Sequence, residues 1–519
     1  MQQLVFCLVA FVSGLLAISA AAQNGNGQTS EWLTVSEASD FEATCSSADV
    51  EAFIKRAADQ SDNISLYQYG ETVEGKPMTA VICANPPFEI GQDDDRPIAL
   101  VIANIHSGEC CGKEAVLTLI RDIANNNQHP WLNGMVTVFV PNYNADGNDK
   151  VALNNRPGQD GPVKGMGKRE TSEGYDLNRD FVKLDSQEAR NMVKLIDELN
   201  PHMFVDCHTT NGSRHQYQLT YDVPHNPSAP ESIRHMMREK MMPEITSNLD
   251  SNGFKAFYYG NFDREYTTWT TYGYEPRYST EYVGMRGRLA ILSEAYSYIS
   301  FKDRIDVSRA FVTECLNYLQ KNSDEIIALL DETESNWLKE VAENPDSIEM
   351  HLRADLKPYE QPFDILGFDG DSPKTYSVEF VSNYIPTVSK SVPKAYVFSG
   401  DMKLIADRLR NHGIEVEELN EPTSFEVEVA SIDKINRFER PFQKHFMTSL
   451  DVSFATETRE FPAGAFVVKT AQPQGRLACY ILESQTNEGW ITWNYLDDYI
   501  SEGGEYPFFR VVKGSTESR

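Results

Sequence analysis

Four acidic or imidazole side chains stand at the ends of apolar runs and could together activate a water molecule. His106 and Glu109 belong to the segment His-Ser-Gly-Glu, which directly follows one such run, while His208 and Glu294 follow two others. Each residue alone also fits a bland role, such as a helix-start Glu or a hydrogen-bonded loop His. Ligands collect at the carboxyl ends of strands in open α/β sheets, so a shared edge favours a joint role. Two imidazoles and one carboxylate are a known ligand set of catalytic zinc, and His106, Glu109 and His208 would supply it.

A second group of polar side chains lies in the short segment 174–181, Gly-Tyr-Asp-Leu-Asn-Arg-Asp-Phe. Arg179 could grip a carboxylate through two parallel hydrogen bonds, which suits recognition of a free chain end. The alternative is an ordinary salt bridge from Arg179 to Asp176 or Asp180. The segment is therefore a candidate substrate-binding loop.

The elements that must position these residues alternate along the chain. Near-continuous apolar runs are typical of strands that are covered on both faces, and apolar residues at helical spacing follow them. We expect strands at 98–105, 135–140, 203–207 and 289–292, and helices at 48–58, 112–125 and 303–343. This alternation predicts an α/β domain over 32–345, with a mixed, mostly parallel sheet sandwiched by helices.

The pattern of the sequence changes beyond residue 346, where short β-prone segments are separated by Pro and Gly. We expect strands at 376–381, 394–398, 425–429, 465–470 and 477–482, and hence a smaller β-rich domain over 346–519. Trp490, Trp493 and Tyr495 could form an aromatic binding face, but closely spaced aromatic residues more often belong to a core.

The N-terminus has the pattern of an exported protein. An apolar run followed by an Ala-rich stretch predicts a signal peptide over 1–22, and a polar linker follows over 23–31. We therefore expect a periplasmic or extracellular protein. No later apolar run reaches spanning length, so the mature chain should have no membrane span.

Charge and cysteine content exclude two further classes. The net charge of −30 argues against nucleic-acid binding, which needs a concentrated positive face. Of eight cysteines, Cys7 lies in the leader, so an odd number remains and a full disulfide framework is excluded. Cys45 and Cys83 could still form one bridge in an oxidising compartment.

Five short motifs occur in a fixed order within about 200 residues. They are His-Ser-Gly-Glu at 106–109, Pro-Asn-Tyr-Asn-Ala-Asp-Gly at 141–147, Gly-Tyr-Asp-Leu-Asn-Arg at 174–179, Asp-Cys-His at 206–208 and Leu-Ser-Glu at 292–294. In this combination the chain resembles the zinc metallocarboxypeptidase family, the group with the carboxypeptidase A fold, from about residue 32 to 343.

The resemblance implies one zinc ion per chain, bound by His106, Glu109 and His208. It implies that Glu294 acts first as the general base and then as the acid. It also implies that Asp176 orients His106 from behind.

The resemblance further implies how a substrate is held. Asn178 and Arg179 would bind its terminal carboxylate, and an arginine would stabilise the oxyanion. Arg169, nine residues before Asn178, matches the spacing of that arginine in several branches, and Arg156 is the alternative. Two residues fit the tyrosine that caps the substrate: Tyr278 and Tyr282.

The function implied is hydrolysis of the C-terminal bond of a peptide with a free carboxylate. A zinc amidase acting on cell-wall peptides or N-acyl amino acids would share the zinc site, and an inactive binding protein would share the fold. Arg286 and Arg288 could favour acidic C-terminal residues, or could be solvated charges or partners of Glu281.

Overall fold

The computed structural model describes residues 32–92 and 94–513. The described residues from Thr34 onward belong to one compact unit by their contacts. The expected signal peptide over 1–22 and the linker over 23–31 lie outside the described residues. Among the described residues, no helix is both long and apolar enough to cross a membrane.

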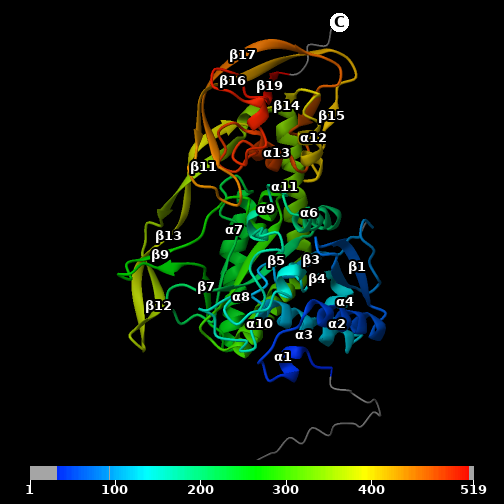
Figure 1. Ribbon diagram of the computed structural model, residues 1–519, viewed down its shortest axis with the longest axis vertical. Helices are drawn as coiled ribbons and strands as arrows, with labels where there is room; N and C mark the ends of the chain where they lie inside the picture. Colours follow the sequence, from blue (N-terminus) through cyan, green and yellow to red (C-terminus); the bar gives the residue numbers. More distant parts are fainter. Residues whose placement is uncertain (1–31, 93, 514–519) are drawn as a thin grey trace, which may run out of the picture. The chain divides into compact units, whose positions relative to one another are not determined.

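A mixed eight-stranded sheet occupies the first part of the chain, in the order β1-β2-β4-β3-β5-β10-β6-β7. Figure 1 labels β1, β4, β3, β5 and β7 of this sheet. Its adjacent strands β4, β3, β5 and β10 are parallel, whereas β1, β2 and β6 join by antiparallel pairing. The expected α/β fold with a mixed sheet is confirmed. The bounds are β1 (Ile64–Glu71), β2 (Pro77–Cys83), β3 (Ile98–Ala103), β4 (Val136–Val140), β5 (Met203–Thr210), β6 (Leu219–Asp222), β7 (Ala256–Tyr258) and β10 (Leu289–Tyr296).

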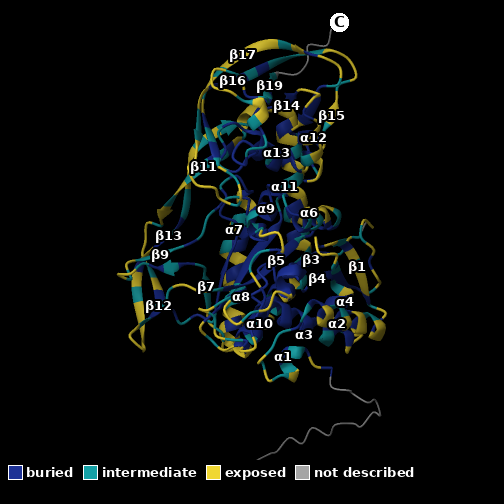
Figure 2. Cartoon of the chain, viewed as in Figure 1, coloured by how far each residue is buried: buried dark blue, intermediate teal, exposed yellow. Residues whose placement is uncertain are grey.

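The central strands are buried along their whole length because helices cover both faces of the sheet. Every residue of β3 and β4 is buried, as Figure 2 shows in dark blue. Leu100 and Ile102 belong to the same apolar cluster as Ile196 of α6 and Val283 of α9. Helices α3 and α10 pack on β5 and on each other. Burial on both faces explains why these strands appear in the sequence as continuous apolar runs.

The helices begin where the sequence supplies caps. Ser46 and Asp49 form a capping box at α2, and Ser186 and Ser300 cap α6 and α10. The helical stretch expected over 303–343 is two helices, separated at Asn322. The bounds are α1 (Val35–Ala38), α2 (Ser47–Gln60), α3 (Cys111–Ala124), α4 (Pro130–Gly134), α5 (Ala145–Asn148), α6 (Gln187–Leu199), α7 (Glu231–Met236), α8 (Met242–Ser251), α9 (Ser279–Met285), α10 (Phe301–Lys321) and α11 (Ser323–Glu343).

The chain beyond residue 346 is rich in strands, as expected. Two sheets form, with the orders β11-β13-β9-β8 and β15-β18-β14-β19-β16-β17, and β12 pairs with β13. The bounds are β8 (Asn261–Phe262), β9 (Thr268–Thr270), β11 (Glu349–Pro358), β12 (Phe363–Asp369), β13 (Ser372–Ser391), β14 (Ala395–Phe398), β15 (Glu417–Glu418), β16 (Thr423–Arg437), β17 (Thr448–Phe461), β18 (Phe466–Lys469), β19 (Phe509–Lys513), α12 (Lys403–Arg410) and α13 (Gly475–Leu482).

The strand expected at 477–482 is wrong, because these residues form the helix α13. All six are buried, and a short, fully apolar run carries no periodicity that separates a strand from a buried helix. Trp490 and Trp493 are also buried, which confirms that they belong to the core.

Residues after 346 share a core and a sheet with earlier residues. One apolar cluster runs from Leu100 of β3 to Tyr396 of β14 and Trp490. In addition, β13 pairs in parallel with β9, so that Phe380 lies opposite Trp269. The boundary between a domain over 32–345 and another over 346–519 stays a prediction.

The cysteines of the described residues are all buried free thiols. The bridge considered between Cys45 and Cys83 is therefore absent from this part of the chain. Instead, the thiol of Cys45 donates a hydrogen bond to Glu114, and Cys83 lies at the end of β2.

His412, just after α12, joins the later part of the chain to the earlier part. Its Nδ1 accepts a hydrogen bond from the Tyr282 hydroxyl (2.9 Å), and its Nε2–H donates to the Val182 carbonyl (3.1 Å). These partners match the neutral imidazole, which has one acceptor and one donor nitrogen. Burial, together with the nearby Arg286, lowers the pKa of His412 to about 3.

Acid should therefore destabilise the fold through His412. Because its pKa is about 3 in the folded chain and near 6.5 in a free imidazole, the stabilisation is complete above pH 6.5 and declines as the pH falls towards 3. Between pH 6.5 and 4.5 the loss should be about 2 to 3 kcal/mol, at about 1.4 kcal/mol per pH unit. Denaturant unfolding of His412→Asn should show an acid-induced loss that is smaller by this amount. The exposed His235→Asn is the control, and equal acid losses in wild type and His412→Asn would contradict the account.

Candidate active site

His106, Glu109 and His208 converge at the carboxyl ends of β3 and β5. Their ligand atoms all lie within 4.8 Å of one another, and all three residues are buried. Nδ1 of His208 lies 3.2 Å from Nδ1 of His106 and 2.9 Å from Oε2 of Glu109. Three donor atoms thus face one point, as the sequence predicted, and they form the kind of group that holds a metal ion.

The local chain path explains this convergence. Asn104 adopts a left-handed conformation (φ 65°), which turns the chain out of β3 immediately before His106. Asparagine tolerates this conformation better than most residues. At the start of α3, a Cβ on Gly112 would lie 2.5 Å from the Cβ of Cys207. Glycine therefore lets α3 approach β5 closely enough to bring Glu109 beside His208.

A carboxylate lies behind each imidazole. Nε2 of His106 lies 3.0 Å from Oδ1 of Asp176, and Nε2 of His208 lies 2.9 Å from Oδ2 of Asp206. In the neutral imidazole this arrangement places the proton on Nε2 and leaves the Nδ1 lone pair free to bind a metal. Asp206 belongs to the motif Asp-Cys-His, but no role was predicted for it. Its spacing of two residues from His208 on a strand places both side chains on one face, which is the signal that could have identified it.

The electrostatics of the group favour a cation. Burial alone would raise the pKa of Glu109, but His106 and Arg156 outweigh it and hold that pKa well below its usual range. Burial would likewise lower the pKa of His208, yet Asp206, Glu109 and Glu294 raise it well above the usual range. The carboxylates around the two imidazoles therefore stabilise positive charge at this point, carried by a proton or by a metal ion.

Glu294 stands beside the group, on β10 opposite His208 in the parallel pairing with β5. Its side chain is partly exposed in the cavity described below, and Oε2 has no hydrogen-bond partner among the described residues. Burial raises the pKa of Glu294 to about 8; His208 opposes this effect, whereas Glu109 and Asp206 add to it. A carboxylate of this kind can exchange a proton near neutral pH.

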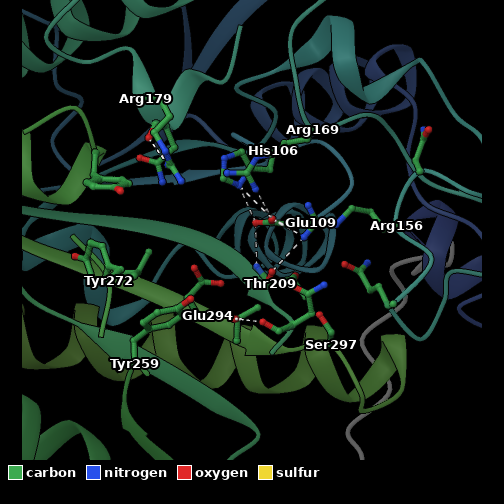
Figure 3. Close-up of a pocket in the computed structure, with 18 of the residues that line it drawn as sticks. His106, Glu109, Arg156, Arg169, Arg179, Thr209, Tyr259, Tyr272, Glu294 and Ser297 are labelled. Carbon is green, nitrogen blue, oxygen red and sulfur yellow. Dashed lines mark hydrogen bonds and ion pairs between the residues drawn. The ribbon is translucent and has the colours of Figure 1, made fainter. Parts of the chain in front are cut away.

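Two arginines border the metal-binding group on the side away from Tyr259 and Tyr272 (Figure 3). Arg169 donates from Nε to Oδ2 of Asp176 (2.9 Å), and its Nη1 lies 3.6 Å from Oε1 of Glu109. Arg156 donates from Nη2 to the same Oε1 at 2.6 Å. The structure thus brings both candidates for oxyanion stabilisation into the site.

Asn178 and Arg179 lie in the same site, with their side chains held differently. The amide oxygen of Asn178 accepts a hydrogen bond from the backbone N–H of Ser279 (2.9 Å). Arg179 donates to the Asn178 carbonyl (2.6 Å) and lies over the Tyr278 ring at 4.4 Å. Among the described residues it makes no ion pair, because Asp180 pairs with Lys183 instead. Its guanidinium is thus available for a ligand carboxylate.

The two candidate capping tyrosines lie in different places. Tyr278 lines the cavity, whereas Tyr282 is fully buried and bonded to His412. Arg286 and Arg288 do not line the cavity either. Their guanidinium groups pair with Asp197 (2.5 Å) and Glu334 (2.9 Å) respectively.

The site contains one cavity of about 410 Å³. Tyr259, Tyr272 and Thr280 in its wall were not identified from the sequence, because their segments carry no motif. The full lining is His106, Glu109, Asn155, Arg156, Pro157, Gly158, Gln159, Arg169, Asn178, Arg179, Thr209, Thr210, Asn211, Tyr259, Tyr272, Tyr278, Thr280, Leu292, Glu294 and Ser297.

Part of the chain is similar to a known protein family. Residues 50–279 match the zinc carboxypeptidase family model. Over this part, the chain is therefore similar to zinc carboxypeptidases. The family consists of peptidases, a class of hydrolases, so the resemblance seen in the sequence motifs is confirmed.

Several proteins that the chain is similar to are named carboxypeptidases. Carboxypeptidase 2 of Trichophyton rubrum is 20% identical over 492 residues, covering 89% of this chain and 86% of that protein. Carboxypeptidase E of Caenorhabditis elegans is 31% identical over 185 residues, covering 34% of this chain and 37% of that protein. Carboxypeptidase A of Helicoverpa armigera aligns structurally with a TM-score of 0.39 at 15% identity, covering 56% of this chain and 74% of that chain.

Replacing Asp206 should weaken metal binding without unfolding the domain. Asp206→Asn keeps the shape of the side chain but removes the charge that fixes the His208 tautomer, so zinc affinity should fall roughly 10- to 100-fold. Competition with a chromophoric chelator measures this affinity. Asp59→Asn, at the exposed end of α2, is the control, and an unchanged affinity in Asp206→Asn would contradict the role of that carboxylate.

Proposed function

We propose that the chain is an exported zinc metallocarboxypeptidase that hydrolyses the C-terminal peptide bond of peptides. One observation carries the proposal: His106 and Glu109, which converge with His208, line one cavity together with Glu294 and with Arg179, whose guanidinium makes no ion pair among the described residues. Export rests on the apolar N-terminal sequence over 1–22.

The donor set fits zinc. Two imidazole nitrogens and a carboxylate oxygen, each backed by a hydrogen-bonded or charged partner, match a catalytic site with one open position. We propose that His106, Glu109 and His208 hold one ion per chain. A bound zinc ion would supply Lewis acidity, which polarises a carbonyl and lowers the pKa of water towards about 7.

Glu294 is proposed as the general base and acid. Its unpartnered Oε2 and its raised pKa suit a group that takes a proton from the attacking water and then gives it to the departing amine. Its place opposite His208 on the neighbouring strand keeps the carboxylate next to the metal ligands.

The substrate's terminal carboxylate is assigned to Arg179 and Asn178. Arg179 has N–H groups to spare, and Tyr278 lies against it in the cavity wall. The Asn178 amide is fixed by Ser279, so its Nδ2 is turned towards His208 (3.4 Å). We propose Tyr278 as the capping tyrosine, because Tyr282 does not reach the cavity.

The two other arginines are assigned different tasks. Asp176 fixes Arg169 through Nε and Nη2, and its Nη1 lies 3.6 Å from the proposed metal ligand Glu109. Because Arg169 lines the cavity there, it is proposed to stabilise charge on the substrate oxygen. Arg156 is bound directly to the carboxylate of Glu109, which makes it a positioning residue for that ligand.

The alternatives differ in their ligands. An amidase on cell-wall peptides or N-acyl amino acids would share the zinc site and differ only in the acyl group that it accepts. The unpaired Arg179 supports a substrate with a free α-carboxylate. An inactive binding protein would not need Glu294 with a raised pKa beside the metal ligands.

Glu294→Gln should abolish turnover while leaving zinc bound. Loss of the proton-transfer group should lower kcat roughly 10²- to 10⁴-fold, and the metal content should stay at one ion per chain. Mass spectrometry of a mixed peptide library, incubated with and without a chelator, reports the bond that is cut. Glu332→Gln on the exposed face of α11 is the control. If the Glu294→Gln variant removed the C-terminal residue from peptides at the wild-type rate, the assignment of Glu294 would be contradicted.

Substitutions of the two arginines should separate their roles. Arg169→Met should lower kcat about 10²- to 10³-fold, with zinc affinity nearly unchanged, because it removes a donor to the developing charge. Arg156→Met should chiefly lower zinc affinity. Steady-state kinetics at saturating zinc and competition with a chelator measure the two effects. A loss of zinc affinity in Arg169→Met together with a loss of kcat alone in Arg156→Met would show that the roles are exchanged.

A further inference from the structure

The substrate-binding loop is held from outside by residues far away in the sequence. This loop, residues 173–185, carries Asp176, Asn178 and Arg179, and the tip of the β16–β17 hairpin lies against it. The Gln443 side chain accepts a hydrogen bond from the backbone N–H of Asp176 (3.4 Å). Lys444 donates to the Glu173 carbonyl (2.9 Å), and its ammonium lies 3.5 Å from the centre of the Tyr175 ring.

The far end of loop 173–185 is held in the same way. His445, also at the hairpin tip, lies with Nε2 2.9 Å from Oδ2 of Asp185. The Tyr495 hydroxyl bonds to the other oxygen of that carboxylate. Arg408 of α12 donates to the Lys183 carbonyl (2.9 Å). Contacts from three separate segments after residue 400 thus span the whole loop.

A second loop of the cavity wall, residues 272–278, is also bound to later residues. Glu488 is fully buried and accepts hydrogen bonds from Nε of Arg277 (2.6 Å) and from the Trp493 indole (2.7 Å). Tyr384 of β13 donates to the Tyr272 carbonyl (2.6 Å). Tyr272 itself lines the cavity, and Arg277 is next in sequence to Tyr278.

The hairpin tip is a tight two-residue turn that presents both side chains to the loop. Phe442 and His445 close the turn through two backbone hydrogen bonds (2.8 and 3.0 Å), and Gln443 and Lys444 between them have positive φ, 49° and 68°. This backbone is the normal one for a two-residue hairpin turn. The turn itself therefore fixes the position from which Gln443 and Lys444 contact loop 173–185.

We propose that Gln443 and Lys444 are positioning residues for substrate binding, and that they hold loop 173–185 in the conformation in which Asn178 and Arg179 meet the substrate's carboxylate. The inference rests on the proposed function and extends it. Loops lose conformational freedom when they bind a ligand, and a loop that is already held loses less. The β-rich part of the chain then contributes to affinity without touching the substrate.

This role has a distinct kinetic signature. Gln443 contacts only the backbone of Asp176, whose side chain keeps its own bonds to His106 and Arg169, and Asp206 holds His208. Removing the contacts of Gln443 and Lys444 should therefore leave zinc in place. Weaker binding of the carboxylate without loss of the reacting groups raises KM and leaves kcat nearly unchanged.

The test uses the full chain with Gln443→Ala and Lys444→Met combined. We expect KM for a peptide with a free C-terminus to rise about tenfold, with kcat within about twofold and zinc affinity unchanged. Lys434→Met, an exposed lysine on β16 of the same hairpin, is the matched control and should behave as wild type. An unchanged KM, or a fall in kcat together with zinc affinity, would overturn the proposal.

Hydrogen exchange separates failure of this inference from failure of the proposed function. In the double variant, the amides of loop 173–185, including that of Asp176, should exchange at least tenfold faster, whereas those of β3 and β5 should not change. This readout needs no substrate. If the wild type were inactive on peptides but the double variant showed the expected exchange pattern, only the carboxypeptidase assignment would be overturned. If exchange in the double variant were the same as in the wild type, the positioning role would be overturned.

Discussion

The pairing of each buried imidazole with a carboxylate behind it is the interaction on which the rest of the site depends. Asp176 faces His106 and Asp206 faces His208, so that both rings turn the same nitrogen, Nδ1, towards Glu109. Without those carboxylates nothing would fix the ring orientation or the tautomer. Burial, with a further contribution from Glu109 and Asp206, raises the pKa of Glu294, and the carboxylates around the imidazoles favour a cation at the centre. The positions of the ligand atoms and the surrounding charges thus both favour a cation at the same place.

The framework around this point combines a rigid centre with supported loops. Strands β3, β5 and β10 deliver His106, His208 and Glu294 from a sheet that is buried on both faces. The substrate-binding residues instead come from loops 173–185 and 272–278, which make their outer contacts with residues after 350. A shared core from β3 to β14 explains how such distant segments can be held in register.

Much of this could be predicted from the sequence. Apolar runs marked the parallel strands because strands buried on both faces lack alternation, and the ligands could be recognised because they follow those runs. The spacing of apolar residues did not reveal the helix α13, because its short apolar run looks like a strand. Nor did it reveal Tyr259, whose backbone N–H donates to the Tyr221 carbonyl of β6, or Tyr272, which follows β9 and its pairing with β13 more than 100 residues away. Tertiary contacts of this kind leave no local pattern, and the place of Tyr282 in the core was unreadable for the same reason.

The most direct test of the account is an anomalous difference map, recorded at the zinc absorption edge from crystals of the zinc-loaded protein. The account predicts one peak per chain, about 2.0 to 2.2 Å from Nδ1 of His106, Nδ1 of His208 and a carboxylate oxygen of Glu109. A peak bound by other residues, or no peak at these three side chains, would contradict it.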